Sequence, residues 1–320
     1  MRNVCMKCMT GTINEEGKCT NCGAINATEK NGSMQLPVRT ILKGKYLVGR
    51  VIGESGLGIT YIGYDQELKK RVAIKEFYPK YNARRMSADG ITICPYNEAT
   101  AEEFESEKEN FINEARILEK FRNEDGVVSV MDYFMENGTA YIVMEYIDGF
   151  TLKSYAGKTM SMAEALKVFK PVMETLVKIH NAGIIHRDIC PENIVISKDF
   201  TKAYLIDFGT AEDVKNGHNM SNYCKSFYSP IEQRCAQTSD KMQQGTWTDV
   251  YALCVTIYGC ITGRVMSDSV SRLMEDDIIM PSELGVDISP AMEAVLMKGL
   301  AVRPEERIQS MEELMQMLYN

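Results

Sequence analysis

Two acidic residues and an amide in the middle of the sequence have the types and spacing to hold a metal ion. Asp188 and Asp207 each follow a short apolar run, and Asn193 lies five residues after Asp188. Residues 194–206 read as two β-branched strands joined by a turn, and such a hairpin would bring the three side chains to one end. Carboxylate and amide oxygens suit a hard cation such as Mg²⁺. If one carboxylate stays free to accept a proton from a nucleophile, the set fits phosphoryl transfer.

Both acids lie in motifs that resemble the catalytic loop and the metal loop of protein kinases. The first motif reads HRD at 186–188, followed by Asn193, and the second reads DFG at 207–209. Either motif alone arises often by chance, whereas the two in this order and on suitable local structure are typical of the family. The resemblance implies that Asp188 orients and deprotonates the substrate hydroxyl, and that Asn193 and Asp207 bind Mg²⁺ or Mn²⁺. A coincidental hairpin of buried acids is the weaker alternative.

The resemblance extends to a glycine-rich strand pair predicted over residues 46–65. Glycine lets backbone N–H groups approach phosphate oxygens, although the cluster alone equally fits an ordinary hairpin. The next strand carries Lys75 as the one charge in an inward-facing run, and the resemblance implies that it places the α- and β-phosphates of ATP. Its implied partner is Glu114, in a helix predicted over residues 99–121. The glycines implied to bind ATP are Gly53, Gly56 and Gly58.

Some residues of this region depart from the family pattern or leave alternatives open. Ser55 stands where the second glycine usually lies, and Thr60 replaces the valine that usually packs on adenine. Neither change removes nucleotide binding. Glu107 and Glu119 are weaker candidates for the partner of the lysine. By resemblance, the residues around the adenine are Met144 behind the base and a hinge from Glu145 to Ile147.

The catalytic loop departs from the family pattern at Cys190. Serine/threonine kinases usually carry a lysine two residues after the catalytic aspartate, where it steadies the transferring phosphate. Lys225 occupies the place in the activation segment where such kinases usually have a threonine near the catalytic loop. We therefore expect Lys225 to reach the phosphate in place of the missing lysine. The alternative is a pseudokinase scaffold that binds nucleotide without efficient transfer.

The activation segment between the metal loop and residue 232 contains several hydroxyls. Arg187 could receive a phosphate on one of them, and such a contact would order the segment. The alternative is that these hydroxyls are ordinary loop residues. The candidates are Thr210, Ser221, Tyr223 and Ser226.

Two acids beyond this segment are implied to fix the fold around the site. Glu232, in a Ser-Pro-Ile-Glu motif, is expected to form a buried pair with Arg307, and this element argues against a small-molecule phosphotransferase. Asp249 resembles the family's acid that binds the catalytic-loop backbone, although it could simply cap its own helix.

Four cysteines near the N-terminus have the spacing of a zinc ribbon of the rubredoxin-like kind. Two Cys-x-x-Cys pairs can each clamp one side of a tetrahedral Zn²⁺. The segment is too short to bury a core, so metal binding would supply its folding energy. Unrelated thiols or a redox pair are the alternatives, and the few basic residues favour protein docking or a purely structural role over nucleic-acid binding. The ligands are Cys5, Cys8, Cys19 and Cys22.

Composition narrows the class of protein further. The chain has 320 residues, with 36 Lys and Arg against 44 Asp and Glu, for a formal charge of −8. This balance disfavours broad binding to nucleic acid or anionic membranes. No apolar run is long enough to span a bilayer, and the N-terminus lacks the apolar region of a signal peptide, so we expect a cytoplasmic protein.

The resemblance as a whole implies an α+β, bilobal protein-kinase-like fold preceded by a small zinc ribbon, most like bacterial serine/threonine kinases. ATP would lie between the lobes, with its γ-phosphate passing to Ser or Thr of a protein substrate, and with self-phosphorylation as an option. Residues 78–98 have no assigned role. The predicted segments are a ribbon at 1–25, a linker at 26–40, a β-rich lobe at 41–146 and a helical lobe at 147–320.

Overall fold

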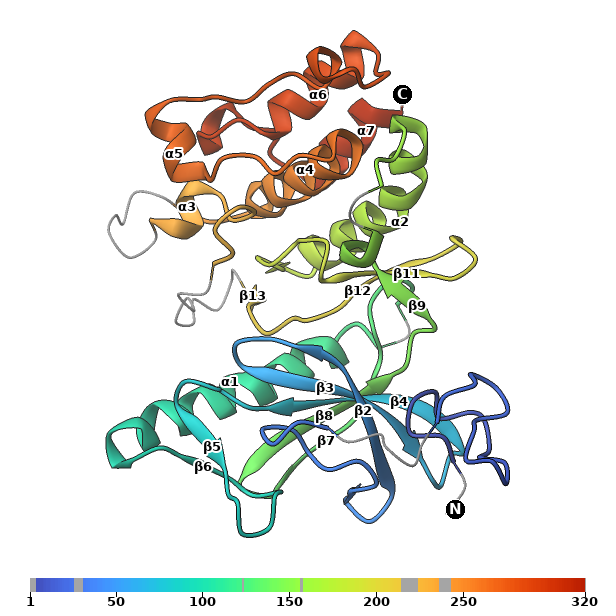
Figure 1. The fold of residues 1–320 in the computed structure, drawn as a ribbon. Coiled ribbons are helices and arrows are strands. Elements are labelled where there is room, and N and C mark those ends of the chain that lie inside the picture. Colours follow the sequence, from blue (N-terminus) through green and yellow to red (C-terminus); the bar gives the residue numbers. More distant parts are fainter. Residues whose placement is uncertain are drawn as a thin grey trace. The chain divides into compact units, whose positions relative to one another are not determined.

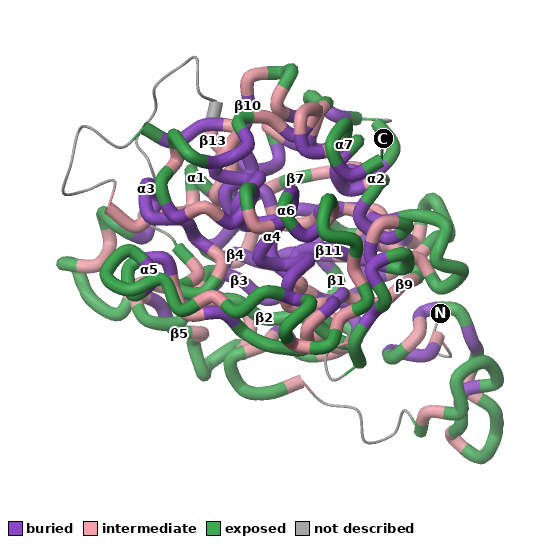
Figure 2. Tube along the Cα trace, turned by 90° about the horizontal axis from the view of Figure 1, so that it is seen from above, coloured by how far each residue is buried: buried purple, intermediate pink, exposed green. Residues whose placement is uncertain are grey.

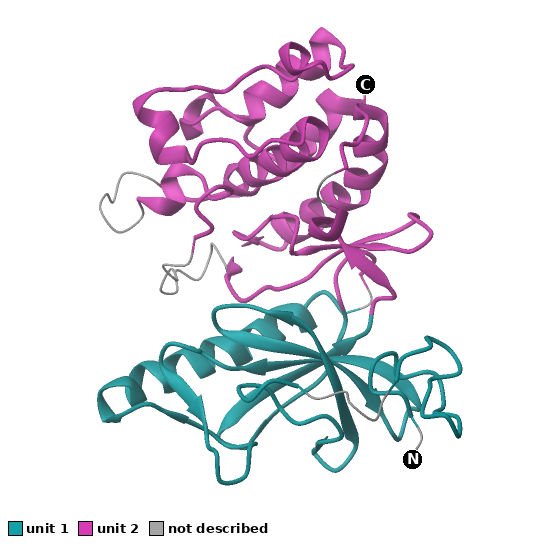
Figure 3. Ribbon diagram, in the orientation of Figure 1, with its two compact units in different colours: residues 1–122, 129–146 teal, residues 123–128, 147–320 magenta. Residues whose placement is uncertain are grey.

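The structure is a computed structural model that describes residues 4–25, 31–122, 124–155, 158–213, 224–235 and 243–319. The chain forms two compact units, which Figure 3 distinguishes by colour. The first unit is rich in strands and the second in helices, which confirms the predicted α+β class (Figure 1). The first unit comprises Met1–Arg122 with Ser129–Tyr146, and the second comprises Asn123–Val128 with Ile147–Asn320.

A six-stranded antiparallel sheet with strand order β1-β2-β3-β4-β8-β7 forms the first unit. The turn between the last two strands uses Asn137 and Gly138 at φ of 54° and 73°, the left-handed backbone that Asn-Gly adopts easily in tight hairpins. The strands are β1 (Ile41–Leu42), β2 (Tyr46–Glu54), β3 (Gly58–Asp65), β4 (Lys70–Phe77), β7 (Val130–Glu136) and β8 (Thr139–Glu145).

Helix α1 (Ala101–Glu119) packs against β7 and β8 (Figure 1). Its buried residues include Phe104, Phe111 and Leu118, which recur at the spacing of one helix face. The ring of Phe77 on β4 lies 5.3 Å from that of Phe104 and 5.6 Å from that of Phe111, measured between centroids. This aromatic contact fixes the helix on the sheet that carries Lys75.

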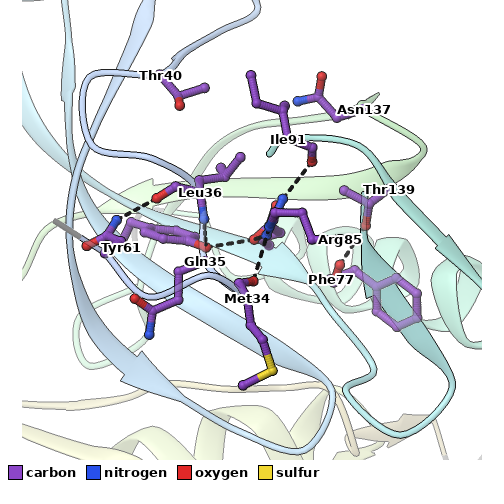
Figure 4. A network of polar contacts seen from close by, with 12 residues as sticks. Met34, Gln35, Leu36, Thr40, Tyr61, Phe77, Arg85, Ile91, Asn137 and Thr139 are labelled. Atoms are coloured by element: carbon purple, nitrogen blue, oxygen red, sulfur yellow. Dashed lines mark hydrogen bonds and ion pairs between the residues drawn. The ribbon is translucent and has the colours of Figure 1, made fainter. Parts of the chain in front are cut away.

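The insertion at residues 78–98 is fixed to the sheet through a buried ion pair. Arg85 approaches Glu76 on β4 with 2.6 Å between Nη2 and Oε2. The hydroxyls of Tyr61 and Tyr141 donate to the same carboxylate at 2.7 and 3.0 Å. Figure 4 shows Tyr61 and Arg85 in this network. With these donors the buried carboxylate is hydrogen-bonded on both oxygens. The insertion contains β5 (Ala83–Arg85) and β6 (Ile93–Pro95), and it leads into η2 (Glu98–Thr100).

Residues 31–40, part of the predicted linker, lie against this same network (Figure 4). The Nε of Arg85 donates to the carbonyl of Met34 at 3.1 Å, and the N–H of Leu36 donates to the hydroxyl of Tyr61 at 2.9 Å. Leu36 is fully buried. This stretch therefore packs on the sheet and is not a free tether.

The second unit surrounds α4 (Thr246–Thr262), which is buried along most of its length, as Figure 2 shows. A capping box between Ser161 and Glu164 begins α2 (Met162–Asn181), and the helix continues through Pro171. The remaining helices are α3 (Ile231–Arg234), α5 (Ser269–Met274), α6 (Pro290–Gly299) and α7 (Met311–Tyr319), with short turns η3 (Leu152–Tyr155), η4 (Ser282–Leu284) and η5 (Pro304–Glu306). The strands are β9 (Gly149–Thr151), β10 (Ile184–Ile185), β11 (Ile194–Ser197), β12 (Ala203–Leu205) and β13 (Glu212–Asp213).

Candidate active site

The predicted hairpin between the two acids is present in the second unit. β11 and β12 pair antiparallel, with Ile194 opposite Leu205 and Ile196 opposite Ala203. Asn193 directly precedes the hairpin, and its carbonyl accepts from the N–H of Ile206 at 3.0 Å. The hairpin thus holds the residues at its two open ends, including the start of the DFG motif, close to one another.

Asp188 lies beside this hairpin, and its side chain is hydrogen-bonded to a neighbouring amide. The side-chain amide of Asn193 donates to Oδ2 of Asp188 at 2.7 Å and to its carbonyl at 2.9 Å. Since the amide nitrogen of Asn193 is used here, its oxygen is the atom that remains to ligate a cation. Asp207, the other predicted ligand, has a left-handed backbone at φ of 66°.

Lys225 also contacts Asp188, with 3.1 Å between its Nζ and Oδ2 of the acid. Asp188 is only 6% exposed. Burial raises the pKa of Asp188 to about 6, and the charge of Lys225 acts in the opposite direction. Burial disfavours the charge on Lys225, but the interactions with Asp188 and Cys190 together outweigh burial and raise the pKa of the lysine. At neutral pH the pair is therefore a carboxylate beside an ammonium, with a carboxylate basic enough to accept a proton.

Cys190, the residue that departs from the family pattern, contacts the same ammonium group. The Nζ of Lys225 donates to Sγ of Cys190 at 2.8 Å. Burial raises the pKa of this thiol to about 12, so it stays neutral and contributes no charge. The structure thus places the ammonium of Lys225 next to both the catalytic-loop cysteine and the acid.

Asp249 on α4 fixes the backbone of the catalytic loop, as the resemblance implied. It is fully buried and accepts the N–H groups of His186 and Arg187, each at 2.8 Å. The ring of His180 lies 2.8 Å from the same carboxylate. Burial opposes ionisation of Asp249, but these hydrogen bonds prevail and lower its pKa. Asp249 does not cap its own helix, because the N-cap residue of α4 is Gly245.

Arg187, expected to receive a phosphate, is already paired with an acid that the sequence reasoning did not single out. Its Nη1 lies 3.0 Å from Oε2 of Glu212 and donates to the carbonyl of Thr210 at 3.3 Å. Pairing of β10 with β13 brings Glu212 opposite Ile185, two residues before the arginine. Of the hydroxyls predicted as phosphorylation sites, that of Thr210 donates to the carbonyl of His186 at 3.1 Å, and Ser226 is exposed. Ser221 and Tyr223 lie outside the described residues.

The predicted pair between Glu232 and Arg307 is confirmed. The two groups lie 2.7 Å apart, and neither side chain is exposed. The hydroxyl of Thr248 donates to the same carboxylate at 3.0 Å, and Arg307 also donates to the carbonyls of Trp247 and Val302. The pair therefore links α3, the start of α4 and the segment that precedes α7.

In the first unit, Lys75 on β4 pairs with Glu114 on α1, as predicted. Its Nζ lies 2.8 and 2.7 Å from the two carboxylate oxygens. The side chain of Glu114 is 1% exposed and that of Lys75 is 10% exposed. Because the pair is bidentate, it fixes the direction of the ammonium group on this strand.

The glycine-rich turn joins β2 to β3 and closes through Ser55. The N–H of Gly58 donates to Oγ of Ser55 at 3.1 Å, and the N–H of Ser55 donates to the Gly58 carbonyl at 2.8 Å. A Cβ on Gly58 would lie 2.8 Å from the carbonyl oxygen of Glu76, whereas one on Gly53 or Gly56 would meet no close contact. Of these three glycines, Gly58 is thus the one that the packing of the strands requires.

The residues predicted to surround the adenine lie at the end of β8 and just beyond it. Met144 is buried between β4 and β7, opposite Ala73 and Val130. The side chain of Glu145 accepts the N–H of Ser129 at 3.0 Å, and the N–H of Glu145 donates to the carbonyl of Ser129, also at 3.0 Å. Ile147 is the first residue of its stretch in the second unit.

Comparison with known proteins identifies the family of this chain. The model of the protein kinase domain matches residues 46–320. The chain belongs to the protein kinase family.

Relatives of this kinase include serine/threonine-protein kinases named PknD. The one from Chlamydia pneumoniae is 29% identical over 307 residues, covering 84% of this chain and 30% of the relative. The one from Mycobacterium tuberculosis H37Rv is 28% identical over 282 residues, covering 85% of this chain and 39% of the relative. The kinase thus spans only about a third of the length of these curated relatives.

A solved structure described as "PpkA-294 apo form" is 30% identical to this kinase. The match covers 89% of this chain and 99% of that one, with a TM-score of 0.77. The predicted kinase fold is therefore confirmed. Across the described ranges, the kinase has no helix with the length and apolar character needed to cross a bilayer.

The four N-terminal cysteines of the kinase gather into one cluster, as predicted. Their Sγ atoms all lie within 4.8 Å of one another, with 3.7 Å between Cys5 and Cys22 and 3.6 Å between Cys8 and Cys19. A tetrahedron with Zn–S bonds of about 2.3 Å has S–S edges of about 3.8 Å, so this set fits zinc. All four cysteines are free of disulfides.

The cysteine cluster is packed onto the sheet of the first unit. Met6 and Met9, which lie between and beside the first two ligands, form a buried apolar cluster with Leu47 and Ile62. The N–H of Arg50 on β2 donates to the carbonyl of Met6 at 3.0 Å. This contact could not be predicted from the sequence, because methionine in a short cysteine-rich segment carries no periodic pattern.

Proposed function

We propose that this kinase transfers the γ-phosphate of ATP to Ser or Thr hydroxyls of protein substrates. The observation that carries the proposal is the buried Asp188 carboxylate, held between the amide of Asn193 and the ammonium of Lys225 on a loop fixed by Asp249. The names of the relatives support the choice of Ser and Thr as acceptors. Self-phosphorylation and a cytoplasmic location remain predictions of the sequence.

In this proposal Asp188 accepts the proton of the substrate hydroxyl. Its raised pKa makes it a better base than an exposed aspartate while it stays largely ionised at neutral pH. The hydrogen bond from Asn193 holds the carboxylate in one orientation, so the attacking oxygen meets a fixed acceptor.

Asn193 and Asp207 are the residues we assign to Mg²⁺ or Mn²⁺, which would neutralise charge on the phosphates. The donor set of one amide oxygen and one carboxylate fits such an ion. Lys75, oriented by Glu114, would contact the α- and β-phosphates. The turn at Gly53–Gly58 would cover the phosphates, and Met144 with the backbone of Glu145 and Ile147 would contact the base.

We propose that Lys225 stabilises the transferring phosphate in place of the lysine that the catalytic loop lacks. Its ammonium lies beside Asp188 and over the neutral thiol of Cys190, so it can stabilise charge on the transferring phosphate. This position weakens the main argument for a pseudokinase scaffold, which rested on Cys190 alone.

We further propose that Cys5, Cys8, Cys19 and Cys22 bind one structural Zn²⁺. The sulfur spacing supports this assignment. Since Met6 and Met9 are packed into the first unit, the ion would stabilise the sheet that carries Lys75 as well as the ribbon itself.

The test of the proposed function is a transfer assay with [γ-³²P]ATP, Mg²⁺ and a generic protein substrate. We expect label on Ser or Thr with the wild type and none above background with Asp188→Asn. Binding of Mg-ATP without transfer by the wild type would favour the scaffold alternative.

A further inference from the structure

A pocket of about 270 Å³ in the second unit adjoins the catalytic loop. Pro191 and Glu192, directly after Cys190, form one wall, and Phe227 and Tyr228, directly after Lys225 and Ser226, form another. Further lining comes from η3, from α4 and from the segment that follows α4, with the residues Leu152, Tyr155, Val255, Gly259, Cys260 and Met266 among them.

The size and walls of this pocket suit amino-acid side chains. Sites for whole small molecules usually enclose about 300–1,000 Å³, so this pocket is better matched to one large side chain or two small ones. Most of its lining residues are apolar or aromatic. An apolar side chain would thus be removed from water here at little cost in lost hydrogen bonds.

The rim of the pocket carries positive charge on a protein that is negative overall. Three lining residues are basic and one is acidic. The acid, Glu192, is paired with Lys153 at 2.9 Å. Lys158 and Arg264 are exposed, and neither has an acidic partner among the described residues. Two unneutralised cations therefore flank an apolar pocket, which is complementary to an acidic segment.

The pocket is lined by residues from the same two segments that carry Asp188 and Lys225. Glu192 lies four residues after Asp188, and Phe227 lies two residues after Lys225, which itself contacts Asp188 at 3.1 Å. An extended peptide advances by about 3.3 Å per residue. A substrate segment whose hydroxyl meets Asp188 therefore brings residues a few positions away to the pocket.

We propose that this pocket selects the substrate: it binds an apolar side chain near the acceptor hydroxyl, while Lys158 and Arg264 bind an acidic residue beside it. The substrate class is a protein segment with Ser or Thr flanked by apolar and acidic residues. This inference rests on the proposed kinase activity and adds the specificity of the same site.

Gly259 on α4 offers a way to fill the pocket without damage to the helix. A Cβ added there meets only the carbonyl oxygen of Arg264, at 3.6 Å, which is an ordinary contact. Replacement of a helical glycine by leucine also favours the helix. The variant Gly259→Leu is therefore expected to fold and to occupy the space meant for the substrate side chain.

The test uses the whole chain and a library of peptides with one fixed Thr, in which Leu or Ala and Glu or Lys are placed at each neighbouring position. We expect the wild type to favour Glu over Lys by about tenfold in kcat/KM, mainly through KM. Lys158→Glu with Arg264→Glu should reverse this preference. Gly259→Leu should abolish the preference for Leu over Ala. Arg303→Glu, an exposed charge reversal elsewhere in the second unit, should match the wild type.

Each outcome bears on one proposal or on both. Equal rates with Glu and Lys peptides, or preferences that survive the pocket variants, would overturn this inference and leave the kinase activity standing. No transfer by the wild type to any peptide or protein would overturn both.

Discussion

The ammonium of Lys225 lies 3.1 Å from the carboxylate of Asp188 and 2.8 Å from the sulfur of Cys190. A positive charge thus lies beside this carboxylate although Cys190, the residue two positions after Asp188, supplies none. Lys225 and Cys190 lie 35 positions apart in the sequence, so the charge that position 190 lacks comes from a distant segment.

Lys225→Ala should therefore lower kcat by about 100-fold, because it removes a charge that acts on the transferring phosphate. Steady-state kinetics with Mg-ATP and a protein substrate measure this. The matched variant Lys225→Ala with Cys190→Lys returns the lysine to the usual place in the loop and should recover part of the loss. Unchanged turnover in Lys225→Ala would contradict the assignment.

The pH profile of kcat/KM should show an acidic limb set by Asp188. The carboxylate must be unprotonated to accept a proton, and its pKa is about 6, so activity should rise as pH increases through about 6. Loss of the positive charge in Lys225→Ala disfavours the carboxylate and should move this limb to higher pH. A limb that stays in place would mean that the lysine does not act on the acid.

Local sequence signals predicted some parts of this structure and were silent on others. The strands around Asn193 were predictable because β-branched runs and turn residues are read over a few positions. The pair of Lys75 with Glu114 spans 39 positions and came only from family resemblance. Ion pairs such as Arg187 with Glu212 leave no periodic pattern in the sequence, because their two residues belong to segments that meet only in the folded chain. They were therefore visible only in the structure.

Removal of one partner from the buried pair of Glu232 and Arg307 should destabilise the second unit strongly. Arg307→Ala leaves a buried carboxylate without its cation, a change that costs about 3–5 kcal/mol. Urea denaturation measures the loss. As a control, Lys178→Ala breaks a half-exposed pair with Glu124 and should cost less than about 1 kcal/mol. Equal losses in the two variants would contradict the role given to the buried pair.

Metal removal should destabilise the first unit as a whole. Without the ion the ribbon would unfold and release Met6 and Met9 from their cluster, which should lower Tm by about 5–10 °C. Metal analysis should find one zinc per chain in the wild type and less in Cys22→Ser. Cys94→Ser alters a cysteine outside the cluster and should keep both zinc and Tm. A ribbon that loses zinc without any change in Tm would show that it does not stabilise the sheet.

The most direct measurement of the central claim compares phosphate transfer by the wild type and by Asp188→Asn, with Mg-ATP binding followed in parallel by thermal shift. The account predicts that both proteins bind Mg-ATP, and that the variant loses about 100- to 10,000-fold in transfer to Ser or Thr. Equal transfer by the two proteins, or binding without transfer by the wild type, would contradict it.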